Sequence, residues 1–116
     1  MTSEASSAAA TTAVFWRFEV ATRVLHPSAT CRALHGLAED APFTYADYLD
    51  AIHPDDRAMH RAALYDAINE TGRFDVKYRI IWPDRSVHRV HTLGMVSPEI
   101  NGTPLQMISA SIELPE

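Results

Sequence analysis

The segment His53-Pro54-Asp55-Asp56-Arg57 constrains the fold of this chain more than any other segment, because it marks where a helix begins. Proline suits the first position of a helix, where its missing amide hydrogen costs nothing, and it keeps the preceding histidine out of the helical region. The two aspartates then lie at the positive end of the helix dipole. We therefore predict a helix over residues 54–71 that ends at a left-handed Gly72.

This predicted helix has one apolar face. Six side chains share it at helical spacing: Met59, His60, Ala63, Leu64, Ala67 and Ile68. A helix of this length, roughly 27 Å, spans a small domain. The sequence therefore predicts that the helix lies across another layer of structure.

The segments on either side of the helix alternate or are rich in β-branched and aromatic residues, which predicts five strands, over residues 14–20, 24–26, 74–82, 86–96 and 105–114. Ser28 and Thr44 each suit the first position of a shorter helix, and Asp47 completes a capping box with Thr44. Two strands, a helical block and three further strands favour an α+β fold. We expect one five-stranded antiparallel sheet with helices packed on one face.

Composition limits the function. The 116 residues suffice for one domain, which we place at residues 14–114 after a disordered or frayed tail at residues 1–13. The net charge is −5 and no lysine or arginine cluster occurs, so we expect no nucleic-acid partner. No apolar run approaches the ~20 residues of a membrane span. The start lacks the pattern of a signal peptide, so we expect a cytoplasmic protein without membrane attachment.

Several short motifs occur in the order found in a known family, where they mark the ends of strands and helices. They are Leu34-His35-Gly36, His53-Pro54-Asp55-Asp56-Arg57, Tyr78-Arg79-Ile80, Asp84-Arg85-Ser86-Val87 and Asn101-Gly102-Thr103-Pro104. From about Trp16 to Glu113 the chain resembles the PAS domain family, in particular its H-P-D-D-R-containing branch. The resemblance implies a pocket between sheet and long helix, and a sensory or regulatory role in signal transduction.

One departure from the family pattern has a structural consequence. The turn at Asp84 usually continues with glycine, but here Arg85 follows. If this turn requires a positive φ, the arginine costs on the order of 1 kcal/mol. We therefore expect a left-handed arginine at this position.

His60 is the first candidate for a binding residue, because it lies on the apolar stripe of the long helix. A neutral imidazole facing an apolar pocket could bind haem iron, as a helix histidine does in haem-binding members of the family. In the alternative, His60 is a core-edge histidine bonded to a backbone carbonyl. Further candidates for lining the pocket, which serve equally as plain core, are Leu64, Ile68, Tyr78, Ile80, Ile108 and Ala110.

Cys31 raises the question of other cofactors. The segment around it looks superficially like the flavin-binding motif of photosensory members of the family, but Cys31 precedes Leu34-His35-Gly36 instead of following it, so we expect no flavin. Cys31 and His35 share a helix face, yet the spacing names no further zinc ligand. We therefore predict no metal site.

Two functional hypotheses remain, and neither involves catalysis, because no nucleophile elbow, phosphate loop or carboxylate pair is present. In the first, the domain senses a small ligand in its pocket. In the second, it is a ligand-free interaction module whose partner is a second copy of itself or an effector domain or protein. The second rests on the last two strands, in which apolar residues occur on both faces. In a sheet with one solvated face, apolar residues are expected on the buried face alone. The residues concerned are Val87, Val90, Leu93, Met95, Val96, Leu105, Met107, Ile108, Ala110 and Ile112.

Overall fold

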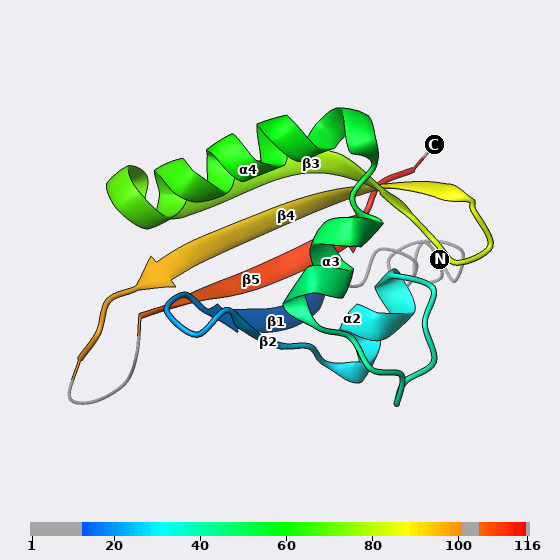
Figure 1. The fold of residues 1–116 in the computed structure, drawn as a ribbon, viewed down its shortest axis with the longest axis horizontal. Helices are drawn as coiled ribbons and strands as arrows, with labels where there is room; N and C mark the ends of the chain where they lie inside the picture. The colour runs from blue at the N-terminus through cyan, green and yellow to red at the C-terminus, as the bar shows by residue number, and fades with distance from the viewer. Residues whose placement is uncertain (1–12, 101–104, 116) are drawn as a thin grey trace, which may run out of the picture.

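The computed structural model describes residues 13–100 and 105–115 (Figure 1). All but the last residue of the predicted tail, and the motif Asn101-Gly102-Thr103-Pro104, lie outside this range. The strands are β1 (Val14–Glu19), β2 (Val24–His26), β3 (Arg73–Ile81), β4 (Val87–Ser97) and β5 (Gln106–Glu113). The helices are α2 (Ala29–Leu34), α3 (Tyr45–Ala51) and α4 (Arg57–Asp66), with short turns η1 (Pro54–Asp56) and η2 (Ala67–Thr71) on either side of α4.

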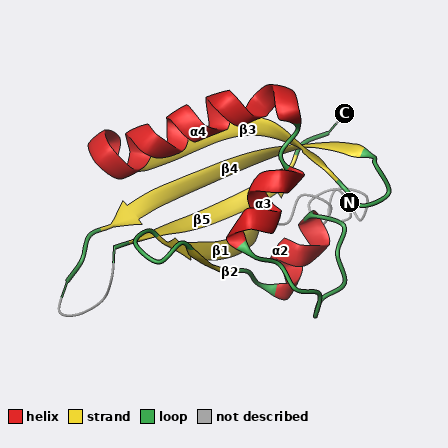
Figure 2. Ribbon diagram, in the orientation of Figure 1, coloured by secondary structure: helices red, strands yellow, loops and turns green. Residues whose placement is uncertain are grey.

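The five strands form one antiparallel sheet in the order β2-β1-β5-β4-β3. Figure 2 shows the three helices lying on the same side of this sheet, with α4 running along β3. The last three strands, β3, β4 and β5, lie side by side in the order in which they follow one another along the chain. The α+β fold with one helix-covered face is therefore confirmed.

The long helical segment has the bounds that the sequence predicts, although it is not uniform. It opens with the 3₁₀ turn η1, continues as α4 and closes with the π-helical turn η2. His53 Nδ1 accepts a hydrogen bond of 3.1 Å from the Asp55 amide, so the histidine caps the first turn. Gly72 ends the segment with φ of 73°.

The carboxylate of Asp56 attaches this helical segment to β3. It accepts hydrogen bonds from the Arg79 amide at 2.8 Å and from the guanidinium Nε and Nη2 at 3.0 and 2.8 Å. These bonds hold the pKa of Asp56 below its ordinary value. Beside them, the His53 amide donates to the Arg79 carbonyl at 2.9 Å. The start of the helix is thus fixed on an edge strand.

The two shorter helices begin at the residues that the sequence predicts. Ser28 Oγ accepts from the Cys31 amide at 3.1 Å, and Thr44 and Asp47 form a reciprocal capping box. These caps satisfy amide groups that have no partner inside the helix. Among the described residues no helix is long and apolar enough to cross a membrane.

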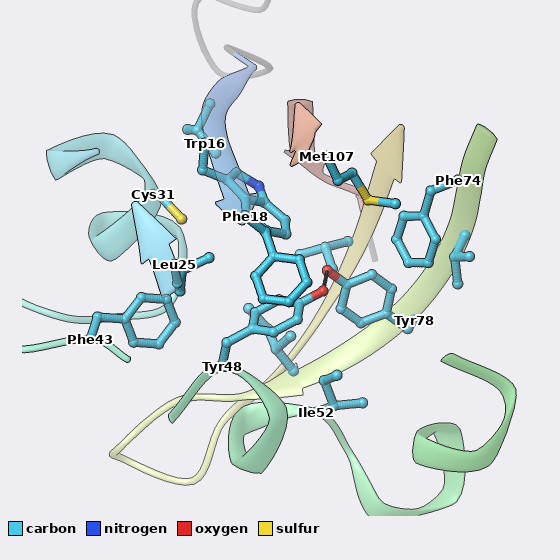
Figure 3. Close-up of a cluster of buried hydrophobic side chains, with 14 of the residues drawn as sticks. Trp16, Phe18, Leu25, Cys31, Phe43, Tyr48, Ile52, Phe74, Tyr78 and Met107 are labelled. Atoms are coloured by element: carbon cyan, nitrogen blue, oxygen red, sulfur yellow. Dashed lines mark hydrogen bonds between the residues drawn. The ribbon is translucent and has the colours of Figure 1, made fainter. Parts of the chain in front are cut away.

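The core lies between the helices and the inner face of the sheet (Figure 3). Aromatic side chains from β1, α3 and β3 fill it, with Met107 from β5 beside Phe74. The void at their centre measures only about 10 Å³, which is at the lower limit of what one water molecule needs. The enclosed interior that the family resemblance implies is therefore packed with side chains.

The orientation of β5 corrects one prediction. Ile108 and Ala110 were expected to line an internal pocket, but Ile108 is 51% exposed and both belong to the outer face of the sheet. The inward residues are Met107, Ser109 and Ser111, all at most 2% exposed. The observed inward set of β5 is one residue out of step with the predicted one. An apolar pattern places Ile108 and Ala110 inward, whereas Ser109 and Ser111 face inward in the structure.

The turn between β3 and β4 contains the predicted left-handed arginine. Arg85 has φ of 74°, its amide donates to the Trp82 carbonyl at 2.8 Å, and Asp84 Oδ1 accepts from the Ser86 amide at 2.9 Å. A side chain in this conformation places Cβ close to a backbone carbonyl, which costs energy.

We expect Arg85→Gly to stabilise the domain by about 0.5–1 kcal/mol, because glycine removes the left-handed cost and returns only part of it as extra freedom of the unfolded chain. Urea denaturation measures the change. Arg89→Gly, in the middle of β4, is the control and should destabilise by a similar amount. A stability of Arg85→Gly below that of the wild type would contradict the expected strain.

Candidate functional site

A cleft of about 530 Å³ opens between α4, α3 and the β1–β2 connection. Its walls are mainly apolar, with arginine, asparagine and tyrosine side chains among them. The residues that line it are Phe18, Val20, Arg23, Tyr45, Leu49, Ile52, Arg57, His60, Arg61, Leu64, Tyr65, Ile68 and Asn69. The volume falls in the range of about 300–1,000 Å³ that is typical of small-molecule sites.

The structure separates the predicted site residues into three groups. His60, Leu64 and Ile68 line the cleft together, as expected from the stripe of the long helix. Tyr78 and Ile80 are buried in the filled core and do not line it. Ile108 and Ala110 lie on the opposite face of the sheet. The helix therefore supplies the predicted lining, and the strands do not.

His60 is buried between the cleft and the core, with 1% of its surface exposed. Its ring stands edge-on to those of Tyr48, Phe74 and Tyr78, with centroids 5.5, 5.3 and 4.9 Å away. Its Nε2 lies 2.6 Å from the hydroxyl of Tyr48. The histidine is thus bonded to a side-chain hydroxyl and not to a backbone carbonyl.

This contact is the end of a buried chain of hydrogen bonds that crosses the core. The Tyr48 and Tyr78 hydroxyls face each other at 3.2 Å (Figure 3), and Tyr78 lies 2.9 Å from Thr92 Oγ1. Thr92 Oγ1 lies 2.7 Å from Ser111 Oγ, which accepts a 3.0 Å bond from the indole N–H of Trp16. The chain runs from α4 through α3 and the last three strands to β1.

The Trp16 end fixes the direction of the first bond in this chain. An indole N–H only donates, so Ser111 Oγ accepts from it. Each of the four hydroxyls has one hydrogen and two lone pairs, so either partner can donate in the bonds between them. The Tyr48 hydroxyl donates to His60 Nε2 when the imidazole hydrogen is on Nδ1, and accepts from it when that hydrogen is on Nε2.

Burial keeps these groups in their uncharged forms. It lowers the pKa of His60 to about 4 and raises the pKa of Tyr48 and of Tyr78 above the ordinary value. Among the described residues no carboxylate bonds to any of the three. The site is therefore suited to holding an apolar group and not to moving protons at neutral pH.

The residues do not fit a haem iron bound by His60. Iron needs an imidazole nitrogen with a free lone pair. Nε2 faces the Tyr48 hydroxyl at 2.6 Å, and the residue is only 1% exposed among three aromatic rings, so an iron atom has no approach to the ring in this position. Binding would require the ring to leave its aromatic neighbours.

Sequence analysis missed the partners of His60. Neither Tyr48, its direct partner, nor the residues further along the chain, Thr92, Ser111 and Trp16, were singled out as polar partners. The signal was nevertheless present, because a buried tryptophan needs a hydrogen-bond acceptor, and hydroxyl residues alternate along the last strand. A search for polar residues at inward positions would have found them.

Cys31 and His35 lie in the core, away from the cleft lining. His35 Nδ1 donates to the Cys31 carbonyl at 2.9 Å, and burial raises the pKa of the Cys31 thiol to about 12. The thiol is therefore protonated at neutral pH. The part of the chain that the structure describes contains no cluster of three potential metal ligands.

The neutral, buried His60 makes stability depend on pH. The unfolded chain binds a proton near the ordinary value of 6.5 and the folded chain only near 4. Between these values the unfolded state carries more protons, so a falling pH favours unfolding. Buried His35 contributes in the same direction.

We expect His60→Gln to reduce the loss of stability between about pH 7 and pH 4 by on the order of 3 kcal/mol relative to wild type. Glutamine keeps an acceptor for Tyr48 but does not titrate. Urea denaturation over this pH range measures the difference between the two proteins. Parallel stability curves would show that His60 is not buried in its neutral form.

Comparison with known proteins agrees with this architecture. The family described as "PAS fold" matches residues 24–111. Over 65 residues, 56% of this chain and 13% of the other, the sequence is 34% identical to the sensor protein FixL of Bradyrhizobium diazoefficiens.

Solved structures show the same fold. A sensory box histidine kinase/response regulator from Burkholderia thailandensis matches with a TM-score of 0.76 and 24% identity, over 97% of this chain and 83% of that one. The N-terminal domain of a diguanylate cyclase with a PAS/PAC sensor from Marinobacter aquaeolei has a TM-score of 0.76 and 16% identity, over 88% and 94%. The chain belongs to the PAS fold family, and it resembles domains that occur in sensor and signal-transduction proteins.

Proposed function

We propose that this domain is a sensory module that binds a small, largely apolar ligand in the cleft beside α4. The cleft itself is the observation that carries the proposal. Leu49, Leu64 and Ile68 line it with apolar surface, and its volume matches that of small-molecule sites. Burial of apolar ligand surface supplies about 25 cal/mol per Å².

The position of His60 supports a route from the cleft to the sheet. His60 lines the cleft and makes the last hydrogen bond of the buried chain. A ligand that displaces its ring removes the imidazole partner of the buried Tyr48 hydroxyl, and leaving such a group unsatisfied costs about 1–3 kcal/mol. Occupancy of the cleft would thereby alter bonds that extend to Thr92 on β4 and Ser111 on β5.

The relatives support a regulatory role. They include a sensor protein, a histidine kinase/response regulator and a diguanylate cyclase. We infer that this domain likewise regulates an effector domain or protein and catalyses no reaction itself. Its buried titratable side chains bond to one another, and no carboxylate among the described residues accompanies them.

We expect 1-octanol, a small apolar probe, to shift the backbone amide resonances of cleft residues such as Leu49, Leu64 and Ile68 in ¹H–¹⁵N spectra. Leu64→Trp fills the cleft and should weaken binding at least about tenfold, equivalent to about 1.4 kcal/mol. Met59→Trp is the matched control, because Met59 lies on the same helix but does not line the cleft.

Two outcomes would contradict this proposal. If neither octanol nor octanoate shifts the amide resonances of the cleft residues, the cleft takes no small apolar ligand. An absorption band of bound haem in the purified protein, lost in His60→Ala, would instead establish the haem sensor that the family resemblance suggested.

The outer face of the sheet supports a second function, self-association. Cross-strand pairing places Phe15, Ala110 and Leu93 in one row, and Ile108 and Met95 in the next. Phe15, Leu93, Met95 and Ile108 are each 50–66% exposed. Together with Ala110, these four residues form what we call the outer apolar patch.

Charged side chains flank the outer apolar patch. Asp75 pairs with Leu93 at one end of the first row, and Arg17 and Arg73 flank the second. An apolar centre with a charged rim is the usual arrangement of a protein interface. Asp75 on β3 and Arg17 on β1 lie at opposite ends of the patch, which suits a second copy of the same chain related by a two-fold axis that brings Asp75 toward Arg17. We therefore propose a homodimer.

We expect Leu93→Asp to weaken self-association at least about tenfold, because the dimer would bury an unpaired charge. Sedimentation equilibrium over a range of concentrations measures the dissociation constant. Met59→Asp places the same charge on the helical side and should leave association unchanged. A wild-type protein that stays monomeric at high concentration would contradict the homodimer.

A further inference from the structure

The charge of the cleft differs from that of the chain. The protein carries a net charge of −5, yet the cleft lining contains three arginines and neither aspartate nor glutamate. The arginines come from two parts of the fold, Arg23 from the β1–β2 connection and both Arg57 and Arg61 from α4. Three cationic side chains therefore lie at an apolar cleft whose lining contains no carboxylate to neutralise them.

Arg57 has a structural role that the other two do not share. Its Nε donates to the Ile52 carbonyl at 3.0 Å and its Nη2 to the Asp50 carbonyl at 3.1 Å, so it fixes the end of α3. Within residues 13–100 and 105–115, neither Arg23 nor Arg61 makes an ion pair or a side-chain hydrogen bond. Two guanidinium groups at the cleft therefore have their donors available.

The backbone at Arg23 adds an independent observation. Its φ is 58°, in the left-handed region where glycine or asparagine is preferred and an arginine costs energy. Turn geometry alone does not call for a charged side chain there.

We propose that the cleft binds an amphipathic anion, a molecule with an apolar body and a single carboxylate or phosphate head. The body would lie against Leu49, Leu64 and Ile68, and the head would accept hydrogen bonds from Arg23 and Arg61. Guanidinium groups match both kinds of head because their donors form a planar fork. This inference rests on the proposed function, since it names the ligand class for the same cleft.

The lining also selects against other ligand classes. A cationic amphiphile would meet three guanidinium groups and no carboxylate in the lining. A neutral apolar molecule gains the apolar contacts but leaves the two available guanidinium groups without an anionic partner. The charge of the head group therefore decides specificity in this cleft, and the apolar walls supply affinity common to all three classes.

Titrations of the whole chain with four octyl probes test this inference. We expect octanoate and octyl phosphate to bind at least about tenfold more tightly than 1-octanol, and octylammonium more weakly than 1-octanol. Raising sodium chloride from about 0.05 M to about 0.5 M should weaken octanoate binding and leave octanol binding unchanged, because only the charged head is screened. Isothermal calorimetry or amide shifts give the dissociation constants.

The double variant Arg23→Gln/Arg61→Gln should bring octanoate to within about threefold of octanol, with little effect on octanol itself. The single variants should each lose part of the preference. Arg89→Gln removes the same charge from an exposed position on β4, outside the cleft lining, and should behave as wild type. Circular dichroism checks that the variants are folded.

The outcomes separate this inference from the proposed function. Equal binding of octanoate and octanol, unaffected by the double variant, would overturn the anionic class while the cleft remained a ligand site. Binding of neither probe would overturn both. A preference for octanoate over octyl phosphate, or the reverse, identifies which head group the two arginines favour.

Discussion

The position of the cleft depends on the bonds between Asp56 and Arg79. They fix the start of the long helical segment on β3 at one point, through one backbone amide and two guanidinium nitrogens. From that point the helical spacing alone determines that His60 faces the core and that Leu64 and Ile68 face the cleft. Charge-assisted bonds of this kind are stronger than neutral ones, which suits a contact that orients a whole element.

The second constraint is the buried chain of hydroxyls, which holds six side chains from different elements in one order. The tryptophan at one end only donates, and each hydroxyl between it and the histidine has a partner on both sides. Loss of any member leaves a buried donor or acceptor without a partner, and this costs more than one bond contributes. The chain therefore favours one arrangement of helices on the sheet over its alternatives.

Local chemistry made most of the fold predictable. The caps at Ser28, Thr44 and His53 involve neighbours in sequence, and so does the left-handed Arg85. The orientation of β5 was not predictable in this way. Its outward positions hold apolar residues such as Ile108, whereas two of its inward positions hold serine. Only the contacts of Ser111 with distant Trp16 and Thr92 show why this serine faces inward. Aspartate 56 was likewise assigned to the helix dipole alone, because its arginine partner lies on another element.

The orientation of β5, with its serines inward and Ile108 and Ala110 outward, connects the proposed ligand site with the proposed homodimer. Serine at position 111 allows the hydrogen-bond chain to reach Trp16 on the inner face, and it leaves Ile108 and Ala110 to the outer face, where they join the outer apolar patch. Trp16 and Phe15 are adjacent on β1 and point to opposite sides of the sheet. The buried chain that begins at His60 in the cleft therefore ends at Trp16, one residue away from Phe15 in the surface proposed to bind a second copy.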